Sequence, residues 1–64
     1  MKQFIEVTVS GSRQLVNVNA IVRVKDGGGE ALIIVVPSSS PEEERIIHAD
    51  QTYEEVLRLI EQAL

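Results

Sequence analysis

Residues 31–36 read Ala-Leu-Ile-Ile-Val-Val, an uninterrupted apolar run in which the last four residues are β-branched. Because a strand turns successive side chains to opposite faces, this run is apolar on both faces. The pattern is typical of a central strand that is covered on both sides. We expect one face to pack against a helix and the other against a curled sheet or a second copy of the chain.

A glycine-rich turn leads into this run. Asp26-Gly27-Gly28-Gly29 separates two apolar stretches, and Asp-Gly in this setting predicts a β-hairpin. A phosphate-binding loop is also rich in glycine, but it ends in Gly-Lys-Ser/Thr and is followed by a helix. Here a strand follows, so we interpret the segment as a hairpin turn.

The N-terminal part alternates between apolar and polar side chains, which predicts half-buried strands. A first turn is indicated by Ser10-Gly11-Ser12. Residues 14–25 alternate for longer than one ordinary strand, so we predict a corner at Asn19-Ala20, where asparagine tolerates left-handed backbone angles. Asn17 and Asn19 are expected to form structural hydrogen bonds there. The predicted strands of this part are residues 4–9, 15–18 and 22–25.

The C-terminal half combines a loop, a strand and a helix. Residues 37–44 consist of proline, serine and glutamate, a composition that cannot pack a core and predicts a mobile loop. Residues 45–49 return as a short strand. Thr52 and Glu55 have the spacing of a capping box, which starts a helix over residues 53–64. Its apolar residues recur every three or four positions and predict one stripe that faces the sheet.

Together these elements predict an α+β fold: a curved antiparallel β-meander of four to five strands, forming a partial barrel, with the C-terminal helix packed on it. The chain has 64 residues and a mass of 7.1 kDa, so we expect a single domain over residues 1–64. A domain of this size often gains stability by self-association, and we expect a homo-oligomer, most simply a dimer. The predicted inner residues are Ile5, Val7, Val16, Val18, Ile21, Val24, Leu32, Ile34, Ile47, Val56, Leu57 and Ile60.

Composition excludes several classes of protein. The chain has no cysteine, which excludes a disulfide scaffold, a thiolate metal site and a cysteine nucleophile. Aromatic residues make up 3% of the chain, too few for a base-stacking platform. No apolar run approaches the roughly 18 residues of a membrane span. The charge at Glu6 interrupts any signal-peptide core, so we expect a cytoplasmic protein with no membrane partner.

The net charge is −4 and the sequence pI is 4.8, which makes nucleic acid a disfavoured partner. The charge is divided unevenly, with +3 over residues 1–25 and −7 over residues 26–64. Such a distribution can orient the chain on a partner or on its own copy, although an ordinary solvated surface gives the same pattern. The cations of the N-terminal part define a candidate interaction surface: Lys2, Arg13, Arg23 and Lys25.

No group of residues predicts a catalytic site, a metal site or a cofactor. His48 is the only histidine, and Asp50 lies on the same side of an extended segment where it can orient the ring, but no nucleophile accompanies them. Glu42-Glu43-Glu44 lacks the ligand spacing of a calcium loop. Ser38-Ser39-Ser40, before Pro41, resembles a phosphorylation site in composition alone. We therefore predict that the chain is not an enzyme.

Two segments carry a resemblance to a known family. Residues 15–24 read LVNVNAIVRV and residues 46–56 read IIHADQTYEEV. They resemble the small bacterial FlbD-type family, named for flagellar and swarming motility, and its relatives in phages and mobile elements. Members have a V-N-x-x-x-I strand with a corner, a glycine-containing hairpin, a two-strand return and an E-S-x-E-E-V helix start. The resemblance implies no catalytic residues.

This sequence departs from the family pattern in two places. Residues 49–52 replace the commoner Val-x-Glu-Ser lead-in to the helix, and the loop at residues 37–45 replaces a tight turn. These departures favour the phage-like relatives over a flagellar factor. The V-N-x-x-x-I strand and late helix also resemble part of the LytTR DNA-binding domain, but this chain is shorter and lacks that family's basic recognition residues.

The leading functional prediction is a non-enzymatic interaction module that self-associates and binds a protein partner. It is based on the small core, the doubly apolar strand and the lack of convergent polar residues. The alternative is a nucleic-acid-associated regulator that uses the basic N-terminal hairpin.

Overall fold

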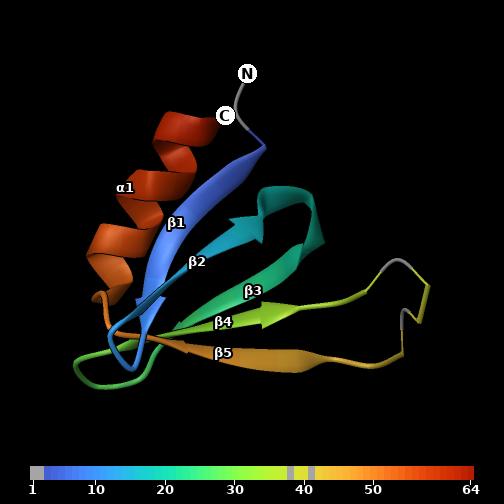
Figure 1. Cartoon of the computed structure of the whole chain (residues 1–64), viewed down its shortest axis with the longest axis horizontal. Coiled ribbons are helices and arrows are strands. Elements are labelled where there is room, and N and C mark those ends of the chain that lie inside the picture. Colours follow the sequence, from blue (N-terminus) through green and yellow to red (C-terminus); the bar gives the residue numbers. More distant parts are fainter. Residues whose placement is uncertain (1–2, 38, 41) are drawn as a thin grey trace.

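The computed structural model describes residues 3–37, 39–40 and 42–64. Within these residues the fold is α+β, as predicted, with five antiparallel strands followed by one helix (Figure 1). The strands divide between two open sheets, β1-β2 and β3-β4-β5, rather than forming one meander. The elements are β1 (Phe4–Val9), β2 (Ser12–Asn17), a 3-10 turn (Val18–Ala20), β3 (Ile21–Asp26), β4 (Ala31–Val35), β5 (Arg45–Ala49) and α1 (Tyr53–Ala63).

A two-residue turn joins β1 to β2. Val9 pairs with Ser12, and the residues between them, Ser10 and Gly11, have φ angles of 51° and 81°. Positive φ at both central positions gives the turn a twist that matches the twist of the flanking strands. The second strand therefore begins directly after the turn, and the predicted start at residue 15 is wrong.

The corner between β2 and β3 is a single 3-10 turn. The side-chain oxygen of Asn17 accepts a hydrogen bond from the backbone N–H of Asn19 at 2.9 Å, which caps this turn. Val18 belongs to the turn and not to the preceding strand, which corrects the predicted boundary. The hydrogen bond confirms a structural role for Asn17, and the turn carries the chain from one sheet to the other.

Residues 31–35 form the central strand of the larger sheet, as their two apolar faces predict. The predicted hairpin before it is also present: Gly28 and Gly29 have positive φ, and the Gly28 N–H donates to Asp26 Oδ1 at 3.0 Å. At the start of β3, a register shift between Ile21 and Arg23 leaves Val22 without a partner on β4. Strand β4 ends at Val35, one residue before the predicted end.

Helix α1 begins with the predicted capping box. The Thr52 hydroxyl accepts from the Glu55 N–H at 3.2 Å, and Glu55 Oε1 accepts from the Thr52 N–H at 3.0 Å. The helix ends at Ala63, so the predicted last residue, Leu64, lies outside it and is exposed. Val56 and Ala63 are buried and attach the helix to the core.

The pH dependence of stability should report this cap. The Thr52 backbone N–H, and then its hydroxyl, hold the pKa of Glu55 below its usual range. Glu55 therefore adds stability above the ordinary glutamate pKa, and this stability is lost as the pH falls through the lowered pKa. We expect Glu55→Gln to reduce the acid-induced fall in Tm, followed by circular dichroism. Glu54→Gln, in the same turn but without a capping bond among the described residues, should not; equal responses would contradict this role.

The core lies between the two sheets and α1. Ile33 and Val7 are fully buried in it, together with Val56. Three predicted inner residues are placed otherwise: Leu57 is exposed, and Leu32 and Ile34 lie on the face of β4 opposite Ile33, where Ile34 is nevertheless buried. The buried core residues are Ile5, Val7, Val16, Ala31, Ile33, Ala49, Val56 and Ala63, with Val18, Ile21, Val24, Ile47 and Ile60 among the partly buried residues against them.

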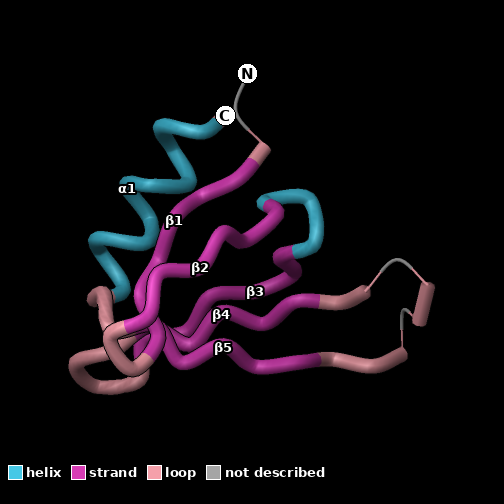
Figure 2. The backbone as a smooth tube through the Cα atoms, viewed as in Figure 1, coloured by secondary structure: helices cyan, strands magenta, loops and turns pink. Residues whose placement is uncertain are grey.

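The connector between β5 and α1 joins the two sheets. The Asp50 N–H donates to the Thr8 carbonyl at 2.7 Å, and the Thr8 N–H donates to Gln51 Oε1 at 3.0 Å. Gln51 Nε2 donates in turn to the Thr8 hydroxyl at 3.1 Å. The Gln51 carbonyl accepts from the Ala31 N–H of β4 at 2.8 Å. Figure 2 shows the ends of β1 and β5 meeting where this connector leads to α1.

Candidate interaction surfaces

The predicted basic residues do not lie on one element. Arg13 is on β2, where its Nε contacts Glu6 of β1, and both side chains are exposed. This pair lowers the pKa of Glu6 and raises the pKa of Arg13. Arg23 and Lys25 are on β3, in the other sheet. Lys2 lies outside the described residues.

Arg23 and Lys25 share the outer face of the β3-β4-β5 sheet. The register places Arg23 beside Ile34 and Lys25 beside Leu32, with Ile46 and His48 on the far strand. Ile34 is buried between its neighbours, whereas 57% of Ile46 is exposed. This face combines an apolar strip with two cations.

The carboxylate beside His48 is that of Glu30 and not that of Asp50. Its Nδ1 lies 3.2 Å from Glu30 Oε1. Asp50 instead accepts a hydrogen bond through Oδ2 from the Gly11 N–H at 3.0 Å, because the connector folds back onto the β1-β2 turn. The His48–Asp50 hydrogen bond that the sequence spacing allows is therefore not formed, and His48 lies exposed on β5.

The loop after β4 contains the remaining sequence candidates. Glu43 lies 3.8 Å from Arg45, an exposed ion pair, and the Ser40 N–H donates to the Pro37 carbonyl at 3.2 Å. Ser38 and Pro41 lie outside the described residues. Among the residues that the structure does describe, no three metal-ligating side chains are grouped.

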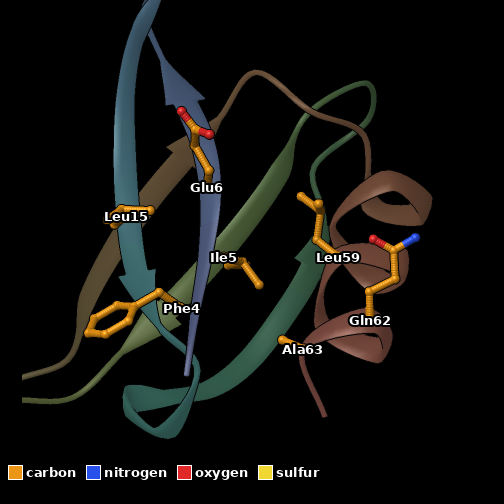
Figure 3. A pocket seen from close by; sticks show the side chains of 7 residues that line it. All are labelled: Phe4, Ile5, Glu6, Leu15, Leu59, Gln62 and Ala63. Carbon is orange, nitrogen blue, oxygen red and sulfur yellow. The ribbon is translucent and has the colours of Figure 1, made fainter. Parts of the chain in front are cut away.

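A groove between β1 and α1 is the surface that the sequence did not predict. Figure 3 shows its apolar half, which has a volume of about 230 Å³. Phe4 and Leu15 border it with 50% and 69% of their surfaces exposed. Both lie on the mainly polar face of the β1-β2 hairpin. Apolar residues on a polar strand face were the only feature of the sequence that could have indicated this groove. The lining residues are Phe4, Ile5, Glu6, Leu15, Leu59, Gln62 and Ala63.

A polar recess of about 350 Å³ continues this groove along α1. It shares Glu6, Leu59 and Gln62 with the apolar half, so the two form one surface. The recess is lined by Glu6, Gln51, Glu55, Arg58, Leu59 and Gln62. We call the combined surface the β1–α1 groove.

The fold and these surfaces define a small α+β domain with two open sheets and a groove along its helix. No protein-family model, curated protein or solved structure matches the chain. In the part of the chain that the structure describes, no helix is both long and apolar enough to cross a membrane.

Proposed function

We propose that this chain is a non-enzymatic interaction module that binds a protein partner through the β1–α1 groove. The observation that supports this function is the exposure of Phe4 and Leu15 beside an apolar recess. Apolar side chains gathered at a surface hollow are typical of interaction sites. The groove also contains charged groups, Glu6 and Arg58 among them, that can fix the orientation of a partner.

Self-association is part of the same proposal. A chain of 64 residues has a small core, so covering apolar surface by a second copy would add stability. The outer face of the β3-β4-β5 sheet, with Ile46 exposed beside Arg23, is a second surface available for this contact. Membership of the FlbD-type family and a cytoplasmic location remain proposals from the sequence pattern.

The alternative function is a nucleic-acid-associated regulator. Its support is the pair Arg23 and Lys25 on one sheet face. Arg13, the third described cation of the predicted surface, is engaged with Glu6, and the whole chain carries −4. Because nucleic-acid affinity depends on cations that replace counterions, this distribution favours the protein partner.

Affinity capture from a bacterial lysate, with and without nuclease, tests the proposed function. We expect a partner that survives nuclease and whose recovery falls about tenfold or more for Leu15→Lys, because a lysine at that position brings a charge into the apolar half of the groove. Val22→Lys is the matched control, since Val22 is also an exposed strand residue but lies on β3.

Three results would contradict parts of this proposal. Equal loss of the partner with both variants would remove the groove as the binding surface. Partners lost with nuclease, in binding that weakens steeply with salt, would favour the regulator. A monomer mass at every concentration in sedimentation equilibrium would exclude self-association.

A further inference from the structure

Among the described residues, backbone groups on the edge of β1 that faces away from β2 have no strand partner. In the β1-β2 ladder the Val18 N–H donates to the Gln3 carbonyl at 2.8 Å, in the same register that pairs Ile5 with Val16. Hydrogen-bonded pairs alternate along an antiparallel ladder. The N–H and C=O groups of Phe4 and Glu6 must therefore point to the opposite edge.

Thr8 shows that backbone groups on this edge can both donate and accept hydrogen bonds. It is the next residue with the same orientation, and the connector already occupies it: its carbonyl accepts from the Asp50 N–H and its N–H donates to Gln51 Oε1. Among the described residues, no corresponding partner reaches Phe4 or Glu6. An unpaired strand edge of this kind is a template for another extended chain.

Helix α1 lies beside this edge of β1, on the side away from β2. Figure 3 shows β2 on one side of β1, and Leu59, Gln62 and Ala63 of α1 on the other. The apolar half of the β1–α1 groove therefore lies along the unpaired groups of Phe4 and Glu6. An edge strand beside a helix, with a hollow between them, is an arrangement that binds extended peptides by strand addition.

The charges of the groove select among such peptides. Its polar half is lined by the carboxylates of Glu6 and Glu55 and by the guanidinium of Arg58, and Arg13 contacts Glu6 from outside this lining. The whole chain carries a net charge of −4, which adds to the attraction for a basic segment. Hydrogen bonds from Arg13 and from Thr52 lower the pKa of the two carboxyls, so both stay ionised at neutral pH. A partner segment with a basic residue is complementary to this end.

We propose that the β1–α1 groove binds an extended basic peptide segment of the partner as an added strand along β1. Backbone groups of this segment pair with those of Phe4 and Glu6. An apolar side chain of the segment lies beside Phe4, and a lysine or arginine two residues away lies beside Glu6, because residues two apart share a strand face. This inference rests on the proposed function and names the chemistry of its partner.

The probe is a library of acetylated, amidated octapeptides in which each position is Leu, Val, Thr, Lys or Glu, selected on the immobilised full chain. We expect enrichment of peptides with an apolar and a basic residue two positions apart, and loss of this enrichment on Leu15→Lys. Amide exchange by NMR, with an enriched peptide bound, should slow about tenfold or more at Phe4 and Glu6. Ile5 and Val7, already paired with β2, should change little.

A second peptide isolates the backbone contribution. Methylating alternate backbone nitrogens of an enriched peptide removes N–H donors without changing its side chains, so binding should be lost in one of the two methylation patterns. Equal binding of both patterns, or slowed exchange confined to α1, overturns strand addition. Enrichment of glutamate overturns the charge assignment.

Two further outcomes separate this inference from the proposed function. Leu15-dependent capture of a protein partner, without any enriched peptide or slowed exchange at Phe4 and Glu6, overturns the added strand and leaves the groove as the binding surface. If the Phe4 and Glu6 amides become more protected as the protein concentration rises, without any peptide, the occupant of the edge is a second copy of the chain. That result overturns the proposal of a peptide from a partner.

Discussion

Replacing Ile33 by alanine is expected to lower the free energy of unfolding by about 2–5 kcal/mol. Ile33 is fully buried on the central strand β4 and belongs to the core that joins both sheets to α1. Its truncation removes apolar contacts and leaves a cavity that the surrounding residues fill only in part. Native proteins have roughly 0.05–0.15 kcal/mol of stability per residue. This single change can therefore remove a large part of the free energy of unfolding and leave a substantial fraction of the molecules unfolded.

Urea unfolding followed by circular dichroism measures this effect. Ile46→Ala is the matched control, because it makes the same truncation on the neighbouring strand β5, where 57% of the side chain is exposed. We expect the control to lose less than about 1 kcal/mol, since much of its side chain is in water in both states. Similar losses for the two variants would mean that β4 is not the centre of the core.

The position of β4 was readable from the sequence, but the orientation of its side chains was not. An apolar run has no polar face to mark the solvent side, so periodicity cannot distinguish Leu32 and Ile34 from Ile33 as inner residues. The prediction placed Leu32 and Ile34 inside. Ile34 is indeed buried, but on the outer face of the sheet with Leu32, whereas Ile33 lies in the core between the sheets and α1. Pairing with Val24 and Ile47 decides this orientation, and those contacts join residues far apart in the chain.

Local signals predicted the helix start well and the helix stripe less well. Thr52 and Glu55 form their cap within one turn, so sequence spacing is sufficient. Leu57 has the same apolar character as Leu59 and Ile60, yet it is exposed, because the sheets cover a narrower sector of α1 than the stripe spans. Ala63, in contrast, is buried although alanine is a weak signal of burial.

The groove could not be predicted because it arises from the packing of two distant elements. Residues 4–6 of β1 and residues 59–63 of α1 come from opposite ends of the chain. Only the apolar character of Phe4 and Leu15 on a mainly polar strand face indicated that something lies there. The charge pattern was less informative, since the 3-10 turn sends Arg13 and Arg23 into different sheets.

Replacing Gln51 by leucine is expected to cost about 1–3 kcal/mol of the free energy of unfolding. The side chain accepts from the Thr8 N–H at 3.0 Å and donates to the Thr8 hydroxyl at 3.1 Å. Leucine fills similar space but can do neither, so a partly buried N–H loses its partner. The backbone bond from the Ala31 N–H to residue 51 is independent of the side chain and should remain.

Hydrogen exchange distinguishes this local loss from a general one. Thr8 should exchange faster in Gln51→Leu than the fall in global stability explains, whereas Ile5, paired with β2, should follow the global change. Gln62→Leu makes the same substitution at an exposed helix position and should leave Thr8 unchanged. If Gln51→Leu speeds exchange of the Thr8 amide no more than exchange of the Ile5 amide, the Gln51 side chain does not hold the end of β1 in place. Because Phe4 and Glu6 lie on the same strand edge, a loosened Thr8 should also weaken any segment that pairs with them.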